Sequence, residues 1–249
     1  MDATATGLNQ YARKSKQALA TERLLALIDT LEVGAAIPAE RRLSSELGIS
    51  RPTVRAAIEE LVREGLLQRR QGSGTYVAEP KIALPLTMTS FSEDMRRRGM
   101  RPGSHVLAFE TTSAGAQVGQ RLQLSPGDPV WRIKRLRLAD DETMAIEALH
   151  VPQGLVPELT RRDLEGGSFY ELLRDRYGIV VSHGMQTTEP TVTDEEESKI
   201  LGVPPHSPAF LFERTTSSDK GEVVEFVRSI YRGDRYRLVA ELRPPFARP

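Results

Sequence analysis

The chain has 249 residues, 39% hydrophobic and 27% charged, and its 34 Lys and Arg balance its 34 Asp and Glu. This length supports two domains, and no run of the roughly 18 apolar residues that a membrane span needs occurs. The absence of cysteine excludes disulfides, thiolate nucleophiles and cysteine-bound zinc. Since the first residues also lack the apolar core of a signal peptide, we expect a soluble, cytoplasmic protein.

The first predicted element is an amphipathic helix over residues 19–31, ending before Gly34. Its apolar side chains recur at helical spacing, at Leu24, Leu27, Ile28 and Leu31. A short second helix follows Pro38 and ends at Gly48, with Leu43 and Leu47 facing inward. The pattern is typical of the first part of a helix-turn-helix.

The third predicted helix begins after Ser50, which we expect to cap it, carries Pro52 in its first turn and ends at Gly65. Its inner face consists of Val54, Ile58 and Leu61. The outer face presents arginines where a recognition helix reads base edges in the major groove. Residues 66–77 then read as a strand, a Gly-Ser-Gly turn and a returning strand, which is the pattern of a DNA-binding wing.

The candidate DNA-contacting residues lie on these helices and on the wing: Arg41, Arg42, Arg51, Thr53, Arg55, Arg70, Gly72 and Gly74. An alternative is a protein-interaction module whose arginines only face solvent. Residues 13–78, with the segment PAERRLSSELGISRPTVRAAIEELVREGLLQRRQGSGTYV, resemble the DNA-binding domain of the GntR family of bacterial regulators. The resemblance implies a winged helix-turn-helix over residues 1–78 that binds double-stranded operator DNA. Ala39 stands where the family usually has Ser, so a helix cap worth about 1 kcal/mol is expected to be missing.

Two prolines in the segment AEPKIALPL, residues 78–86, predict an extended linker over 79–85 and a second domain over 86–249. Its alternating segments predict an α+β domain. The expected strands cover residues 105–111, 130–138, 144–151, 182–190, 208–217 and 222–231. A weak repeat aligns residues 122–151 with 201–231, and Arg135 with Arg214. Two similar units are therefore expected to build one sheet, with the ligand site between them.

Two arginines are predicted to face inward from strand 130–138. Arg135 and Arg137 share one strand face with Trp131 and Ile133, and a buried guanidinium needs an anionic partner. This placement indicates a carboxylate or phosphate ligand. Glu147 is the lone acid on the inner face of the next strand, where it can bond sugar hydroxyls or an amine, or pair with Arg135 in a structural salt bridge.

Three capping boxes are predicted in the second domain, at Ser90 with Glu93, Ser168 with Glu171, and Thr193 with Glu196. The free amides of such a helix N-terminus can bind phosphate, although a cap is also found without any ligand. Gly99 is expected to close the helix that Ser90 begins.

Residues 86–245 resemble the UTRA ligand-binding domain of the HutC subfamily, whose fold resembles chorismate lyase. The motifs TSFSEDMRRRGM, RLRLADDETMAIE and VRSIYRGDRY are similar to regulators of N-acetylglucosamine utilisation, which sense amino-sugar phosphates. The resemblance implies a phosphate site at Thr89, Ser90, Phe91, Arg135 and Arg137. It implies sugar contacts from Glu147, Ser168, Tyr170, Glu225 and Tyr231.

We therefore expect a homodimeric, DNA-binding transcription regulator, a repressor controlled by glucosamine 6-phosphate or N-acetylglucosamine 6-phosphate. The alternatives are a regulator that senses another carboxylate or phosphate metabolite, an enzyme with chorismate lyase-like activity, and an architectural DNA binder without an effector. The sequence predicts no cofactor, no metal site and no catalytic residue, since its four histidines lack metal-ligand spacing and no nucleophile motif occurs.

Overall fold

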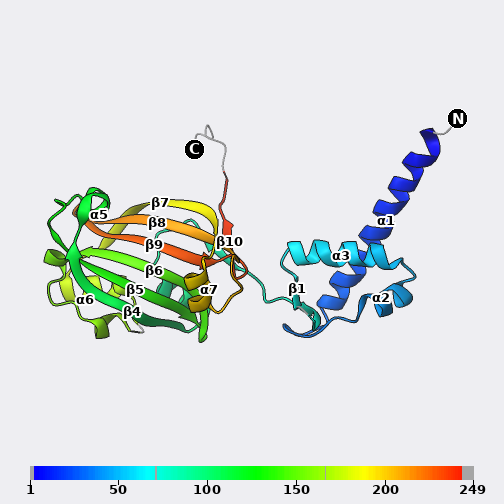
Figure 1. The fold of residues 1–249 in the computed structure, drawn as a ribbon, viewed down its shortest axis with the longest axis horizontal. Coiled ribbons are helices and arrows are strands. Elements are labelled where there is room, and N and C mark those ends of the chain that lie inside the picture. Colours follow the sequence, from blue (N-terminus) through cyan, green and yellow to red (C-terminus); the bar gives the residue numbers. More distant parts are fainter. Residues whose placement is uncertain (1–2, 71, 166, 243–249) are drawn as a thin grey trace, which may run out of the picture. The chain divides into compact units, whose positions relative to one another are not determined.

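The computed structural model describes residues 3–70, 72–165 and 167–242, with side chains from residue 16 onward. The chain divides into two compact units, Met1–Ile82 and Ala83–Pro249 (Figure 1). Within the described ranges, no helix has both the length and the apolar character needed to cross a bilayer.

The first unit is a winged helix-turn-helix. Its elements are α1 (Ala3–Ile28), α2 (Glu40–Leu47), α3 (Arg51–Arg63), β1 (Leu67–Arg70) and β2 (Gly74–Val77). A core that includes Leu24, Leu43, Ile58 and Leu61 joins the three helices. Residues 34–37 lie beside β2, where the Gly34 N–H donates to the Val77 carbonyl at 2.9 Å.

Two local expectations for this unit are wrong. The first helix begins at Ala3 and ends at Ile28 rather than covering 19–31. It ends there because the amides of Thr30 and Leu31 bond carbonyls three residues back, which tightens the chain into a turn. Ser50 does occupy the cap position of α3, but its hydroxyl bonds the Thr53 hydroxyl at 2.8 Å and caps no backbone amide.

Other expectations for the first unit are confirmed. Gly48 ends α2 in the left-handed conformation with φ of 63°, which glycine adopts without strain. Ala39 is the N-cap residue of α2 and offers no side-chain cap bond. The predicted hairpin is present, with Arg70 opposite Gly74 at the end of the ladder.

The second unit is built on a six-stranded antiparallel sheet in the order β4-β5-β6-β9-β8-β7 (Figure 1). All six predicted strands are present: β4 (Pro102–Ser113), β5 (Pro129–Ala139), β6 (Glu142–Pro152), β7 (Val181–Val192), β8 (Pro208–Ser218) and β9 (Val223–Arg232). The halves β4–β6 and β7–β9 meet where Leu149 of β6 lies opposite Val227 of β9. The sequence repeat thus corresponds to two similar halves of one sheet.

Helices cover both faces of this sheet. On one face, Ile133 and Leu149 pack in a core with Phe169 and Leu173 of α6 (Phe169–Tyr177). On the other face, α5 (Gly115–Leu122) packs against Val130 and Phe226, and α7 (Glu195–Leu201) packs against Ile146 and Ile230. The remaining helical elements are α4 (Phe91–Arg97) and two short 3₁₀ turns, η1 (Gln153–Leu155) and η2 (Arg161–Leu164).

Three features of the second unit differ from expectation. The segment expected to be only a linker contains β3 (Ile82–Pro85), which pairs with β10 (Tyr236–Val239), and neither strand was predicted. The cap of α7 is Asp194 rather than Thr193, because the Asp194 carboxylate accepts from the Glu197 N–H at 2.7 Å. Thr193 is instead buried and accepts a bond from the Ser198 hydroxyl at 2.7 Å.

We predict that Ile133→Ala lowers the free energy of unfolding by about 2–5 kcal/mol, because Ile133 is completely buried in the core of the second unit and its loss leaves a cavity. Urea unfolding of the full chain measures the change. The matched control is Leu107→Ala on β4, which removes a side chain that is 40% exposed. Equal losses for the two variants would contradict this assignment of the core.

Candidate DNA-binding and effector-binding sites

Helix α3 places the predicted base-reading residues at its N-terminal end. Arg51 and Arg55 are exposed and Thr53 is half-buried. Arg55 is held by Glu40, since its Nε and Nη2 donate to Glu40 Oε2 at 3.0 and 2.9 Å. The guanidinium is therefore oriented by a neighbouring helix, α2, rather than free in solvent.

The other candidate DNA contacts lie on α2 and the wing. Arg41 and Arg42 are exposed on α2, and the Nε of Arg42 donates to Glu46 at 2.6 Å. On the wing, the Arg70 guanidinium lies 4.4 Å from the centre of the Tyr76 ring. Gly72 and Gly74 are exposed at the tip, with φ of 71° and 124°. Without a Cβ, this tip can approach a sugar-phosphate backbone closely.

A cavity of about 410 Å³ lies within the second unit. This volume is in the range of small-molecule sites. Nine of the ten predicted effector-binding residues line it, from Thr89 to Tyr231. The exception is Ser168, whose hydroxyl instead donates to Ser90 Oγ at 3.1 Å. The contact of Ser168 with the sugar stays a prediction.

Two buried guanidiniums border the cavity. Arg135 is 4% and Arg137 2% exposed. Nη2 of Arg135 donates to Glu147 Oε2 at 2.7 Å, and Nη2 of Arg137 donates to Ser92 Oγ at 2.8 Å. The Nε and Nη1 atoms of both arginines are buried and have no hydrogen-bond partner among the described residues. Buried unpaired donors are destabilising, so this pair is incomplete without an acceptor.

The salt bridge that the sequence left open as an alternative does form. Glu147 lies directly opposite Arg135 in the β5–β6 ladder, which explains the contact. Burial acts to raise the pKa of Glu147, but the charges of Arg135 and Arg137 outweigh it and lower the pKa. Burial lowers the pKa of Arg137 to about 10, so it stays charged at neutral pH. One carboxylate thus faces two cations, and an excess positive charge remains.

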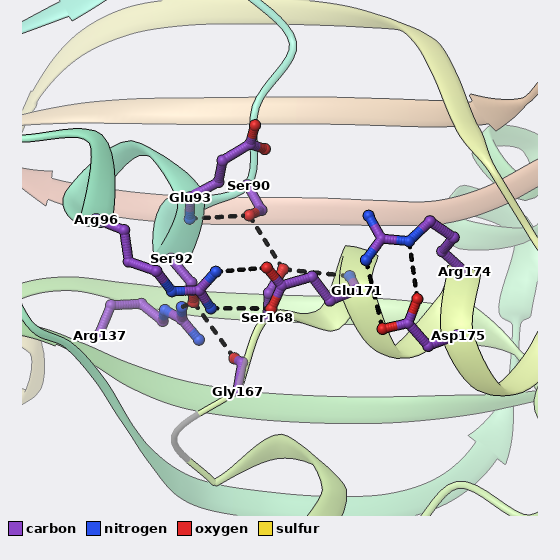
Figure 2. A network of polar contacts seen from close by, with 10 residues as sticks. All are labelled: Ser90, Ser92, Glu93, Arg96, Arg137, Gly167, Ser168, Glu171, Arg174 and Asp175. Atoms are coloured by element: carbon purple, nitrogen blue, oxygen red, sulfur yellow. Dashed lines mark hydrogen bonds and ion pairs between the residues drawn. The ribbon is translucent and has the colours of Figure 1, made fainter.

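The N-termini of α4 and α6 meet beside Arg137 (Figure 2). Ser90 Oγ accepts from the Glu93 N–H at 3.2 Å, and Ser168 Oγ accepts from the Glu171 N–H at 3.3 Å. Because Ser90 Oγ also accepts from Ser168, its own hydroxyl hydrogen remains available to the cavity. Arg96 of α4 pairs with Glu171 of α6, which ties the two helices together.

Glu225 forms a second polar centre in the cavity. It is 3% exposed, and its Oε1 accepts from the Tyr170 hydroxyl at 2.6 Å and from the Thr216 hydroxyl at 3.0 Å. Burial raises the pKa of Glu225, although Tyr170 and Arg214 act in the opposite direction. Both of these bonds fall on Oε1, so Oε2 is the oxygen that suits a ligand hydroxyl or amine.

Sequence reasoning missed Arg214 and Ser92, both of which line the cavity. Nε of Arg214 donates to Gln186 Oε1 at 2.8 Å, and its Nη1 donates to the Thr89 carbonyl at 3.3 Å. The internal repeat aligns Arg214 with Arg135, so that signal was available. For Ser92 the sequence offered no comparable signal, apart from its position near Ser90 at the start of α4.

Comparison with protein families identifies both units. Residues 16–77 match the model described as bacterial regulatory proteins, gntR family, and residues 97–237 match the UTRA domain. The chain belongs to the GntR family. Its expected fold, an α+β chain with a winged helix-turn-helix and a UTRA domain, is confirmed.

Several named relatives of this GntR regulator are repressors. It is 39% identical over 204 residues to the HTH-type transcriptional repressor NagR of Bacillus subtilis, covering 82% of this chain and 84% of NagR. It is 34% identical over 211 residues to the mannosyl-D-glycerate transport/metabolism system repressor MngR of Escherichia coli, covering 84% and 87%. The crystal structure of PhnF from Mycobacterium smegmatis superposes with a TM-score of 0.65 at 30% identity, covering 90% of this chain and 99% of PhnF. This GntR protein is a DNA-binding transcription regulator with a domain for a small-molecule effector.

We predict that Glu147→Gln lowers the free energy of unfolding by about 3–5 kcal/mol at pH 7, because it leaves two buried guanidiniums without a counter-charge. The folded-state pKa of Glu147 is lowered, so its stabilising effect is complete above the unfolded pKa of about 4.3 and is lost as the pH falls through the folded value. Urea titrations from pH 7 to pH 3 measure the difference, which should shrink toward the acid end. The exposed pair of Glu110 with Arg132 supplies the control, since Glu110→Gln should change stability by less than about 1 kcal/mol.

Proposed function

We propose that this GntR regulator is a homodimeric repressor that releases its operator when the UTRA domain binds an amino-sugar phosphate. Glucosamine 6-phosphate and N-acetylglucosamine 6-phosphate are the expected effectors. The observation that carries the proposal is the set of four buried guanidinium nitrogens of Arg135 and Arg137 that have no hydrogen-bond partner within the described residues. They lie beside a cavity that suits a small molecule.

The phosphate is placed against the two arginines and the start of α4. A phosphate oxygen accepts charge-assisted bonds from guanidinium donors, and it can also accept from the free hydroxyl hydrogen of Ser90. Thr89 and Phe91 flank Ser90 in the cavity wall, and the Arg137 guanidinium lies 4.6 Å from the centre of the Phe91 ring. The excess positive charge beside Glu147 favours a doubly charged group over a neutral one.

The sugar is placed toward Glu225 and Glu147. Glu225 Oε2 is available to a hydroxyl or to the amine at the sugar's second carbon, and Tyr170 fixes the carboxylate through Oε1. Tyr231 lines the same cavity and supplies an aromatic wall. Ser168 acts through Ser90 in this arrangement, because its hydroxyl is already engaged there.

Repression and dimerisation follow from the family and from the geometry of operators. NagR and MngR are both named as repressors. One winged helix-turn-helix reads only a half-site, so two copies with two-fold symmetry are needed for a palindromic operator. We place the dimer interface in the UTRA domain, and we place the protein in the cytoplasm, where bacterial operators are.

The chain segment that enters the UTRA domain connects the cavity to the DNA-binding unit. Residues 84–92 all line the cavity, and α4 begins within them. A bound effector would order residues 86–99 and change how the two DNA-binding units of the dimer are held for their half-sites. Such a change weakens operator binding only because the effector prefers one of the two arrangements.

Two alternatives use the same cavity. Another phosphorylated or carboxylated metabolite would satisfy the same arginines, and titration with a panel of such compounds separates it from the amino sugars. A chorismate lyase-like enzyme would release product from chorismate, and detection of that product would overturn a purely sensory role. The names of the relatives as repressors and regulators favour the sensor.

We predict that calorimetric titration of the full chain shows binding of glucosamine 6-phosphate or N-acetylglucosamine 6-phosphate, and that Arg135→Ala abolishes this binding and the release of operator. Operator affinity without effector should stay unchanged, because Arg135 lies in the other unit. Arg132→Ala, on the opposite face of the same strand and 58% exposed, is the matched control and should bind normally. The proposal fails when the wild-type chain binds no phosphorylated sugar.

We predict that Arg51→Ala weakens operator binding by about 1–3 kcal/mol and relaxes base preference at one position, because an arginine at the start of the recognition helix can grip guanine with two bonds. Fluorescence anisotropy with the operator and with single-base variants measures both effects. Arg63→Ala, at the far end of α3, is the control and should leave base preference unchanged. An equal loss on every DNA sequence would make Arg51 a phosphate contact instead.

A further inference from the structure

Tyr236 is a buried tyrosine that neither the motifs nor the family resemblance assigned to the effector site. It is the first residue of β10, is 1% exposed and lines the cavity. Its hydroxyl is buried and has no hydrogen-bond partner among the described residues. A tyrosine buried this deeply normally finds a partner for its hydroxyl, so an unpaired one beside a cavity indicates a bond that a ligand completes.

The surroundings of Tyr236 place it at the end of the cavity where Arg135 and Arg137 lie, which we call the anion end. Its ring meets the edge of the Tyr231 ring at 5.0 Å between centres. Burial, followed by Tyr231 and Asp94, raises the pKa of Tyr236, while Arg98 and Arg137 act in the opposite direction. The hydroxyl therefore stays protonated and can donate. Arg137, one of its charged neighbours, is also one of the two arginines with unpaired donors.

We propose that Tyr236 is a further effector-binding residue, whose hydroxyl donates a hydrogen bond to the anionic group of the ligand. The inference rests on the proposed function and adds a residue to its phosphate site. Among the described residues, this end of the cavity offers unused donors: guanidinium nitrogens of Arg135 and Arg137, the hydroxyl of Tyr236, and the hydroxyl hydrogen of Ser90, whose oxygen already accepts two bonds. Phosphate oxygens only accept when fully ionised, so a phosphate can satisfy this set together, whereas a sugar hydroxyl or an amine cannot.

Tyr236 lies on a strand that pairs with the segment through which the chain enters the UTRA domain. Strand β10 pairs with β3, and the boundary between the two units falls within β3, after Ile82. Leu84 and Pro85 of β3 line the same cavity as Tyr236. Arg98 holds the segment from α4, because its Nη2 donates to the Ala83 carbonyl at 2.6 Å. A ligand bonded to Tyr236 therefore fixes the strand against which the entering chain is paired.

The test is Tyr236→Phe in the full-length protein, titrated with glucosamine 6-phosphate by calorimetry. Loss of one hydrogen bond to a charged group should weaken binding about tenfold or more. The ligand concentration that releases the operator, measured by fluorescence anisotropy, should rise by the same factor. Without ligand, the variant should unfold at the same temperature as the wild type or higher, because the substitution removes an unpaired buried hydroxyl.

Tyr177→Phe is the matched control. The Tyr177 hydroxyl is likewise buried without a hydrogen-bond partner in the described ranges, but Tyr177 does not line the cavity. Its variant should bind glucosamine 6-phosphate like the wild type. Wild-type affinity in Tyr236→Phe would overturn the inference and leave the proposed function intact, as would an equal loss in both variants. If Tyr236→Phe is less stable than the wild type without ligand, Tyr236 has a structural role, and the inference is overturned. Absence of binding by the wild type would overturn the proposed function and the inference with it.

Discussion

The ion pair of Arg135 with Glu147 is the interaction on which the UTRA domain depends. Two guanidiniums are buried in the sheet, and a single carboxylate in the next strand compensates them. Removing that carboxylate leaves two buried cations without it, while keeping it leaves four guanidinium nitrogens with no hydrogen-bond partner in the described part of the chain. The fold can therefore be stable without ligand and still gain free energy from an anion, because the missing acceptors are the ones that a phosphate carries.

The two halves of the sheet divide the cavity between them. The first half contributes two arginines and a glutamate, and the second half contributes one arginine and one glutamate. Only Arg135 and Glu147 of the first half hydrogen-bond each other directly. In the second half, Tyr170 and Thr216 hold Glu225, and Arg214 holds the Thr89 carbonyl. The first half thus keeps positive charge for an anion, and the second keeps a carboxylate oxygen for hydroxyl or amine groups. The two similar halves of the sheet therefore differ in the polar groups that they present to the cavity. This difference suits a ligand with an anionic group at one end and a sugar at the other.

The sequence alone predicted the features that depend on local contacts or on a periodic pattern of side chains. Burial alternates along β5 from Ile133 to Arg137, and the inward face of Arg135 and Arg137 follows from that period of two. It did not predict short segments that form a strand only by pairing with a segment far away in the chain. Strand β3 has four residues and ends in proline, and β10, which also has four, lies more than 150 residues away. Tyr236 was missed for the same reason, since its burial beside Arg137 depends on that pairing.

The chain between Ile82 and Ser90 is the covalent connection between the DNA-binding unit and the wall of the effector cavity. Among the groups that hold this segment are β10 through the β3 ladder, Arg98 through the Ala83 carbonyl, Arg214 through the Thr89 carbonyl and Ser168 through the Ser90 hydroxyl. An effector shifts a two-state equilibrium only by the difference in its affinity for the two states. In the function proposed above, Ser90, Tyr236 and Arg137 all donate to the phosphate, so the effector selects the state in which these three donors reach it. On this proposal, binding free energy fixes the chain at the entry of the UTRA domain, and a ligand without the anionic group lacks these contacts.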